Sequence, residues 1–256
     1  MQCLKCGVEN DAGSNFCNSC GENFRGQNGD TQKTQKSGIG SGERRQVTAM
    51  FADVVGSTPL AERIGEEALY KVMQEVITEM SAAVADHGGT IEKLTGDGLM
   101  ALFGAPLAVE DAPVNACRAG LEILARIKAK SSGDEAMDEA LQIRVGVNSG
   151  YAVVGSLGGQ LQQEVTALGD AVNVAARLEG LAKPGTMVVG ESTYQLVRDF
   201  VSAEFAGEHA VKGKTEVQKI WRINGINADA SRFGASVRRG LSKLVGRERE
   251  VETLLS

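Results

Sequence analysis

The order of apolar segments from residue 46 onward constrains the fold more than any other feature of this sequence. Residues 46–55 form an apolar run typical of a buried strand. Residues 60–84 repeat apolar side chains at helical spacing, with a predicted break near Gly65. The apolar runs 90–96 and 98–104 share a Gly-Asp-Gly turn, which predicts a β-hairpin.

The elements expected after the hairpin complete the pattern. A second helix is predicted over 111–130, since Asp and Pro stand at its start. Segments 143–150 and 151–159 are interpreted as a second strand pair, and 169–185 as a third helix closed by Pro and Gly. The core order of strand, helix, strand, strand, helix and strand predicts an α+β, ferredoxin-like (split βαβ) domain, with a mainly antiparallel sheet covered by helices.

Composition excludes several classes of protein. Of the 256 residues 42% are hydrophobic, so a sizeable core can be buried, and the net charge of −6 disfavours nucleic-acid binding by the whole surface. No apolar run is long enough for a transmembrane span, and the N-terminus lacks the apolar core of a signal peptide. We therefore expect a cytoplasmic protein without a membrane segment.

Four cysteines at the N-terminus form two CxxC pairs. Cys3, Cys6, Cys17 and Cys20 give the spacing C-x2-C-x10-C-x2-C, which suits tetrahedral coordination of structural Zn²⁺ by four thiolates. A segment as small as 1–24 cannot fold on its own core, so the metal would hold it together. Disulfides or free thiols are the alternative. The role of such a ribbon is open: a protein partner is one candidate and nucleic acid is a less favoured one.

Two aspartates are candidate magnesium ligands. Asp53 lies near the end of the first strand, where a buried carboxylate must be paired, hydrogen-bonded or bound to metal. Gly56, Ser57 and Thr58 follow at the start of a helix, whose free backbone N–H groups suit a polyphosphate. Asp97 lies at the hairpin tip, and in a ferredoxin-like fold both carboxylates could face one Mg²⁺ environment. Turn formation or capping is the alternative interpretation of each Asp taken alone.

Three segments together carry a family resemblance. FADVVGST (51–58), EKLTGDGLMALFG (92–104) and ALGDAVNVAARLE (167–179) closely resemble the class III adenylyl/guanylyl cyclase family, in its order and spacing. The resemblance implies the ferredoxin-like fold and a homodimer with active sites at the subunit interface. It also implies that Asp53 and Asp97 hold two Mg²⁺ (or Mn²⁺) ions per active site.

The resemblance assigns the nucleotide base to two residues. Lys93 matches the family's base-reading lysine, and Thr166 matches the second base-reading position. Guanylyl cyclases usually carry Glu and Cys or a similar pair there, so Lys with Thr points to ATP. Thr at the second position is typical of a subgroup related to soluble, bicarbonate-stimulated cyclases, which makes bicarbonate stimulation a hypothesis.

A separate helix carries the residues matched to catalysis. Asn173 and Arg177 match the pair that orients the ribose and stabilises the transition state. They are one turn apart, on the flank of a helix whose Val174, Leu178 and Leu181 are expected to face the core. The planar guanidinium of an arginine suits phosphate oxygens as charge builds on them.

The remaining matches concern the phosphates and the partner chain. Lys212 matches a lysine that contacts the terminal phosphates. Tyr151 occupies a place where some members have a phosphate-binding arginine, so a cation from that position cannot be assumed. In a symmetric homodimer the two aspartates of one chain would face the base-reading and transition-state residues of the other, which gives two equivalent sites.

The sequence therefore predicts four parts: a zinc ribbon (1–24), a flexible linker (25–43), a nucleotidyl cyclase catalytic domain (44–228) and a C-terminal stretch (229–256). The end of that stretch resembles the opening of an AAA-type ATPase module, with a short surface helix as the alternative. The predicted function is adenylyl cyclase in intracellular signalling, converting ATP to 3′,5′-cyclic AMP and pyrophosphate. A guanylyl cyclase and a catalytically silent regulatory or scaffold module are the alternatives.

Overall fold

The computed structural model describes residues 8–9, 42–131, 141–157, 164–210, 217–227, 246 and 248–255. The chain divides into two compact units, Met1–Gly38 and Ile39–Ser256. Five residues of the predicted sites lie outside the described residues, so the zinc ribbon and the terminal-phosphate lysine stay predictions: Cys3, Cys6, Cys17, Cys20 and Lys212.

From β1 to β4 the larger unit follows the predicted core order of strand, helix, strand, strand, helix and strand, with the first helix divided into α1 and α2. Its described elements are β1 (Glu43–Val55), α1 (Ser57–Ile64), α2 (Glu66–Asp86), β2 (Thr90–Leu94), β3 (Gly98–Phe103), α3 (Ala112–Ser131), β4 (Gln142–Leu157), β5 (Glu164–Leu168), α5 (Asp170–Leu181), β6 (Thr186–Gly190), α6 (Glu191–Val197), β7 (Val201–Ala210), β8 (Val217–Ile226) and α8 (Glu248–Leu255). The hairpin and the helix break at Gly65 are confirmed, because α1 ends at Ile64 and α2 begins at Glu66.

The strands form one eight-stranded sheet in the order β2-β3-β1-β4-β6-β8-β7, with β5 paired to β4 outside this path. The α+β class is confirmed, but the sheet is mixed. β4 and β6 run parallel, whereas the other neighbouring strands are antiparallel. The prediction of a mainly antiparallel sheet did not include this pair. Because α5 crosses over between β4 and β6, the two strands can run in the same direction.

The prediction of two short strands at 143–150 and 151–159 is wrong, since β4 is one continuous strand. It pairs with β1 from Glu43↔Val154 to Val55↔Gln142. The buried Ser149 hydroxyl lies 2.8 Å from the Thr48 hydroxyl, in a hydrogen bond that either side chain can donate. This bond joins β1 and β4 next to the position where the prediction had divided β4 into two strands.

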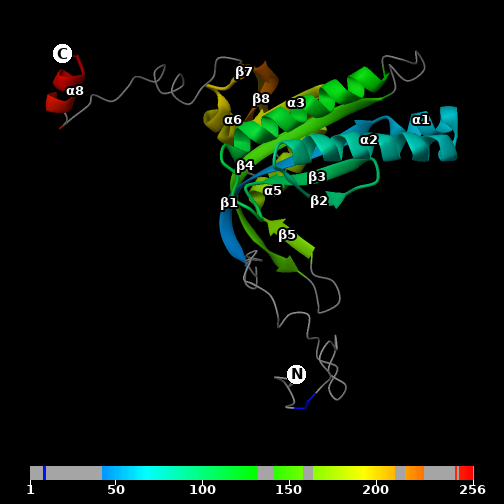
Figure 1. The fold of residues 1–256 in the computed structure, drawn as a ribbon. Coiled ribbons are helices and arrows are strands. Elements are labelled where there is room, and N and C mark those ends of the chain that lie inside the picture. The colour runs from blue at the N-terminus through cyan, green and yellow to red at the C-terminus, as the bar shows by residue number, and fades with distance from the viewer. Residues whose placement is uncertain are drawn as a thin grey trace. The chain divides into compact units, whose positions relative to one another are not determined.

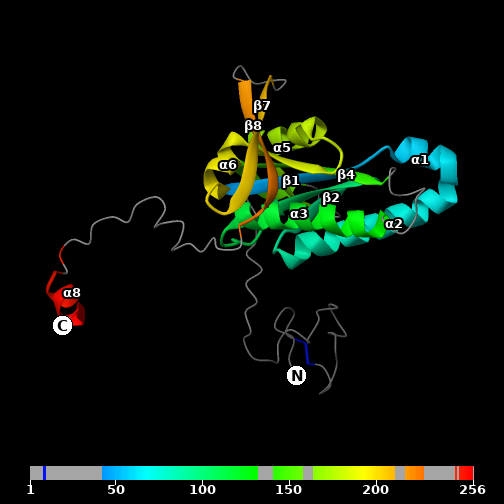
Figure 2. The ribbon, with the colours of Figure 1, turned by 90° about the horizontal axis from the view of Figure 1, so that it is seen from above.

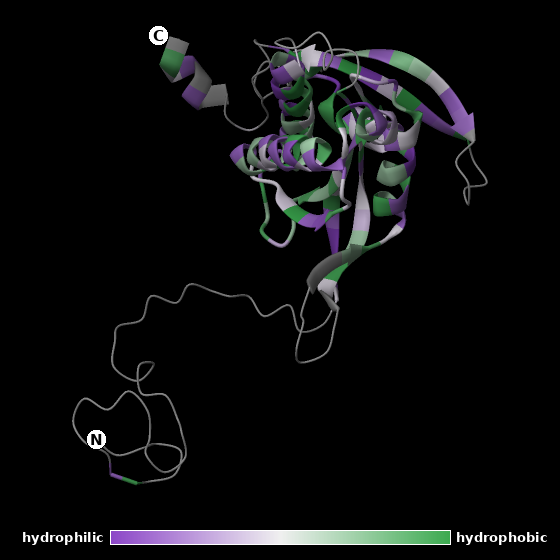
Figure 3. Cartoon of the chain, turned by 90° about the vertical axis from the view of Figure 1, so that its right-hand side faces the viewer, coloured by the Kyte–Doolittle hydropathy of each residue, from purple (hydrophilic) through white to green (hydrophobic). Residues whose placement is uncertain are grey.

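Helices cover both faces of the sheet. Figure 2 shows α2 and α3 on one face and α5 on the other, and Figure 1 shows α2 and α3 lying along the sheet. In β1, Met50 packs into the cluster with Val84 and Ile123, whereas Ala49 packs on the opposite face with Ala175. Hydrophilic and hydrophobic residues alternate along the helices (Figure 3), as amphipathic helices require. None of the described helices is long and apolar enough to cross a membrane.

The close approach of α5 to β4 depends on Gly146. A Cβ atom at this position would lie 2.1 Å from the backbone nitrogen of Glu179 and 2.5 Å from the carbonyl oxygen of Ala175. Backbone atoms cannot rotate away as the end of a side chain can. Any larger residue at 146 would therefore push α5 off the sheet.

We expect Gly146→Ala to lower the free energy of unfolding by about 3 kcal/mol, the upper part of the range for overpacking, because the clash is with backbone. Urea unfolding followed by circular dichroism measures this change. Gly180→Ala is the matched control, because a Cβ there would meet no described atom within 4 Å apart from the nearby backbone of its own helix. That control should gain roughly 0.5–1 kcal/mol from helix propensity. Equal stability of the two variants would contradict this account of the α5–β4 packing.

Candidate active site

Asp53 and Asp97 meet where β1 ends. Asp53 pairs with Gly98 of β3 on one side and with Arg144 of β4 on the other. Asp97 lies in the turn between β2 and β3, and its carbonyl oxygen accepts a hydrogen bond of 3.0 Å from the backbone N–H of Val54. Strand pairing thus holds the hairpin tip against the end of β1 and brings the two aspartates together.

Gly98 leaves room for the Asp53 carboxylate. A Cβ atom at 98 would lie 2.5 Å from Asp53 Oδ1 and 2.9 Å from Thr95 Oγ1. The second glycine of the Gly-Asp-Gly turn is therefore needed for the carboxylate as well as for the turn. A side chain at this position would displace the Asp53 carboxylate that the sequence assigns to metal.

The start of α1 lies beside the same carboxylates. Gly56 precedes the helix with φ 76° and ψ 27°, a left-handed conformation that glycine adopts without strain. The half-buried Ser57 donates a hydrogen bond of 2.8 Å from Oγ to Asp97 Oδ2, and Thr58 is exposed. Among the described residues, no side chain caps this helix start. Its first N–H groups can therefore donate hydrogen bonds to an anion.

Arg144 and Glu179 are neighbours of Asp53 that the sequence analysis did not identify. Nη2 of Arg144 lies 3.7 Å from Asp53 Oδ2, and Nε of Arg144 lies 3.0 Å from Glu179 Oε1. The sequence did contain one indication of an ion pair here. Arg144 lies within the apolar run 143–147, and a charge on a buried strand needs a partner. The partner came from α5, and the sequence does not show that this helix lies over β4.

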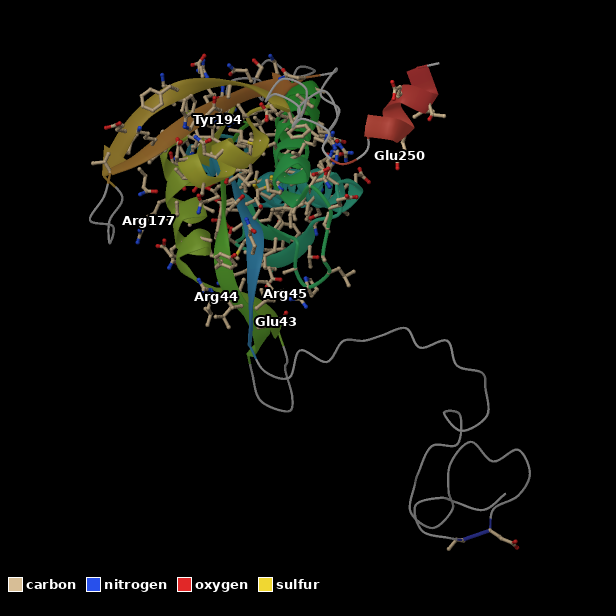
Figure 4. The ribbon with its side chains drawn as sticks, turned by 90° about the vertical axis from the view of Figure 1, so that its left-hand side faces the viewer. Glu43, Arg44, Arg45, Arg177, Tyr194 and Glu250 are labelled. Atoms are coloured by element: carbon tan, nitrogen blue, oxygen red, sulfur yellow. The ribbon has the colours of Figure 1, made fainter. Side chains whose placement is uncertain are left out.

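The described residues assigned to the nucleotide come from β2, β5 and α5. Lys93 is exposed in β2, and Thr166 pairs with Gly155 of β4 through the backbone of β5. On α5, Asn173 is exposed and Arg177 is half-buried. Figure 4 shows Arg177 projecting outward from α5. Within the described part of the chain, no hydrogen bond or ion pair joins Lys93, Asn173 or Arg177 to Asp53 or Asp97.

Two of the three α5 residues that were expected to face the core do so. Val174 and Leu178 are buried as expected, but Leu181 is 38% exposed, because it lies in the last position of α5 where the helix leaves the sheet. Tyr151 is 59% exposed, and the Arg44 guanidinium lies 4.6 Å from the centre of its ring. A cation is therefore present next to Tyr151, but it comes from β1.

Residues 40–225 match the family model of the adenylate and guanylate cyclase catalytic domain. The chain belongs to this family. Adenylate cyclase 1 of Rhizobium meliloti (strain 1021) is 34% identical over 186 residues, which are 72% of this chain and 28% of that relative. An uncharacterized protein of the same strain, R02095, is 36% identical over 220 residues, which are 85% of this chain and 21% of that relative. The chain thus spans between 21% and 28% of the length of these relatives.

Solved cyclase structures share the fold. The adenylyl cyclase CyaB from P. aeruginosa superposes with a TM-score of 0.68 at 30% identity, covering 75% of this chain and 100% of that one. The guanylyl cyclase Cya2 gives a TM-score of 0.67 at 27% identity, covering 74% of this chain and 97% of that one. Adenylyl and guanylyl cyclases both match, so the fold of this cyclase domain does not select between ATP and GTP.

The surroundings of Asp53 disfavour its negative charge when no cation is bound. The pKa of Asp53 is raised to about 6 by burial, and then by the charges of Asp97 and Glu179, which Arg144 only partly offsets. The described residues contain no cluster of three or more His, Cys, Asp or Glu side chains arranged to hold a metal. Two carboxylates are nevertheless the usual protein share of a Mg²⁺ site, where substrate phosphates complete the coordination. The residues present therefore fit Mg²⁺ or Mn²⁺ bound together with a nucleotide.

The raised pKa predicts how the metal-free cyclase domain responds to pH. Asp53 titrates near 6 when folded and near 3.8 when unfolded, so the folded state holds the extra proton between these values. Stability should therefore fall as pH rises through this window. In EDTA at pH 7.5, Asp53→Asn should be more stable than the wild type by about 1–2 kcal/mol, after allowance for solvent screening.

Thermal unfolding in EDTA at pH 4.5 and 7.5 tests this expectation. Most of the advantage of Asp53→Asn should be lost at pH 4.5, where the native carboxyl is protonated. Asp86→Asn, which changes an aspartate of 58% side-chain exposure, serves as the control. An advantage of the same size at both pH values would show that the charge of Asp53 is not its cause.

Proposed function

We propose that this chain is the catalytic part of an adenylyl cyclase. Attack of the ribose 3′-hydroxyl on the α-phosphate of ATP forms 3′,5′-cyclic AMP and releases pyrophosphate. The observation that carries the proposal is the carboxylate pair of Asp53 and Asp97, held by strand pairing next to the open start of α1. Two negative groups that lack a full counter-charge, beside donors suited to phosphate, fit a metal–nucleotide complex.

Different residues of the chain would bind the metal ions and the phosphates. Asp53 and Asp97 would hold the two Mg²⁺ or Mn²⁺ ions, and Ser57 keeps the Asp97 carboxylate oriented through its hydrogen bond. Bound metal supplies charge neutralisation and makes the ribose hydroxyl more acidic. The first N–H groups of α1, from Ser57 and Thr58 after the turn at Gly56, donate to phosphate oxygens. Lys212 would add a cation at the terminal phosphates.

Four other residues would bind the base and the ribose and stabilise the transition state: Lys93, Thr166, Asn173 and Arg177. Lys93 donates to a ring nitrogen of adenine, and the Thr166 hydroxyl accepts from the exocyclic amine, a donor–acceptor pair that suits adenine. Asn173 orients the ribose by hydrogen bonding. The Arg177 guanidinium donates to phosphate oxygens as charge builds on them, which stabilises the transition state more than the bound substrate.

A second copy of the chain would complete each site. The described contacts join Asp53, Asp97 and Ser57, but they do not include Asn173 or Arg177, which lie on α5. In a symmetric dimer, α5 of one protomer can face the carboxylates of its partner, and two equivalent sites result. We therefore propose a homodimer as the active unit.

The remaining parts of the proposal concern the ends of the chain. Cys3, Cys6, Cys17 and Cys20 would bind structural Zn²⁺, in a ribbon that contacts a protein partner. The proposed domain boundaries remain 1–24 for the ribbon, 25–43 for the linker, 44–228 for the cyclase domain and 229–256 for the C-terminal stretch. Helix α8 in that stretch is compatible both with the opening of an ATPase module and with a short surface helix.

Nucleotide turnover across protein concentration tests the proposed function. Purified chain with Mn²⁺ is expected to convert ATP to cyclic AMP, with a specific activity that rises with protein concentration because dimers are needed. Turnover of GTP should be much slower. Faster cyclic GMP formation would instead establish a guanylyl cyclase. Absence of both products at concentrations where the chain is dimeric would support a catalytically silent module.

A further inference from the structure

We infer that Glu179 is a positioning residue that anchors Arg144, so that the arginine offsets the charge of Asp53 without blocking its metal-binding oxygens. This inference rests on the proposed function, because it concerns the same metal site. The observation behind it is a row of three charged groups, in which Glu179 of α5 pairs with Arg144 of β4 and Arg144 reaches Asp53 of β1.

The two contacts of Arg144 are unequal. Its Nε lies 3.0 Å from Glu179 Oε1 in an ion pair that lacks hydrogen-bond geometry, and both atoms are shielded from solvent. Its Nη2 lies 3.7 Å from Asp53 Oδ2, which is longer than the 2.7–2.9 Å of a charge-assisted hydrogen bond. The guanidinium is therefore held mainly by Glu179, and it acts on Asp53 as a nearby charge.

Glu179 is well placed to act as a fixed anchor. Its backbone lies directly over Gly146, where only a glycine leaves room for α5. Its side chain is 15% exposed, against 29% for Asp53. The glutamate therefore ties the cation to a helix that is packed rigidly on the sheet, and not to the mobile end of an exposed side chain.

Loss of this anchor would turn Arg144 from a neighbour of the metal site into a competitor. A guanidinium without another partner forms bidentate pairs with carboxylates, because its planar fork matches the two oxygens. Asp53 is the next carboxylate within reach. A bidentate Arg144–Asp53 pair would occupy the oxygens that the metal needs, so the metal would bind more weakly.

Binding of Mn²⁺ to the full chain, measured by isothermal titration calorimetry without nucleotide, tests the inference. Glu179→Gln should weaken Mn²⁺ binding about tenfold, the lower end of the effect of groups that support metal ligands. Arg144→Gln should bind Mn²⁺ at least as tightly as the wild type. The double variant should resemble Arg144→Gln, because without the arginine there is nothing for Glu179 to anchor.

The double variant separates anchoring from a simple loss of negative charge. If Glu179→Gln weakens Mn²⁺ binding equally with and without Arg144, the effect is that of charge alone and the inference is overturned. Unchanged Mn²⁺ binding in Glu179→Gln would also overturn it. The neutral double variant keeps the test valid if Glu179→Gln alone folds poorly, because it leaves no unpaired charge.

Asp53→Asn distinguishes failure of the inference from failure of the proposed function. If Asp53→Asn binds Mn²⁺ as the wild type does, the proposed metal site itself is wrong. If Asp53→Asn loses Mn²⁺ binding while Glu179→Gln retains it, the metal site stands and only the anchoring role is wrong. For active protein, the Mn²⁺ concentration that gives half-maximal activity should rise in Glu179→Gln, while kcat at saturating Mn²⁺ stays within about threefold of the wild type.

Discussion

Asp53→Asn is expected to lower cyclic AMP formation by about a thousandfold, and the protein should remain folded. The amide has the shape of the carboxylate but lacks its charge, so the proposed metal site would lose one of its two anionic ligands. The structure predicts that stability does not suffer, because the raised pKa of Asp53 shows that its charge is unfavourable in the metal-free fold. Steady-state cyclic AMP production at saturating Mn²⁺ and ATP measures the effect.

Asp86→Asn is the control for the loss of activity expected in Asp53→Asn. Asp86→Asn removes an aspartate that is 58% exposed and pairs with Arg126 on the far side of the domain, in the α2–α3 layer. This control should retain activity within about twofold, because a surface ion pair contributes little. If Asp53→Asn kept a tenth or more of the wild-type activity, the carboxylate could not be a principal metal ligand.

Arg177→Lys is expected to lower kcat by about a hundredfold and to leave the KM for ATP nearly unchanged. Lysine keeps the positive charge but loses the planar pair of donors that can hold two phosphate oxygens. Arg177 is half-buried and takes part in none of the ion pairs among the described residues, so a lysine there should not disturb the fold.

The exposed Arg118 of α3 offers a matched control for this substitution. Among the described residues it donates a hydrogen bond to Asn115 of its own helix and to no other side chain, and Arg118→Lys should leave kcat unchanged. Steady-state kinetics of both variants with ATP provide the comparison. A rise in KM alone for Arg177→Lys would place this residue in substrate binding and not in stabilisation of the transition state.

Local sequence patterns predicted the structure correctly where residues close together in the chain determine it. The Gly-Asp-Gly turn predicted the β2–β3 hairpin, because the residues that turn the chain are adjacent. Gly65 marked the boundary between α1 and α2, and it adopts φ 83°, which a residue with a side chain rarely takes. The placement of Asp97 beside Asp53 followed from the expected fold, since a hairpin next to the first strand brings its tip to that strand's end.

Predictions from the sequence were wrong or missing where the structure depends on contacts between segments that are distant in the chain. The predicted division into strands 143–150 and 151–159 was wrong because Gly150 lies within the continuous strand β4, where its small size admits Ala171 of α5. The parallel pairing of β4 with β6 depends on a crossover that no local pattern specifies. The Arg144–Glu179 pair likewise requires knowledge that α5 packs on β4. The residues needed from a partner chain were inferred only from the family resemblance.

Complementation between two inactive variants tests most directly the claim that Asp53 of one chain works with Arg177 of another. Asp53→Asn and Arg177→Ala should each be nearly inactive alone. A mixed dimer holds one doubly defective site and one intact site, so equal mixing with free exchange should restore about a quarter of the wild-type activity. The contrary result is a mixture whose activity, with subunit exchange demonstrated, is no higher than the summed activities of the two variants measured separately. That result would contradict a site shared between two chains.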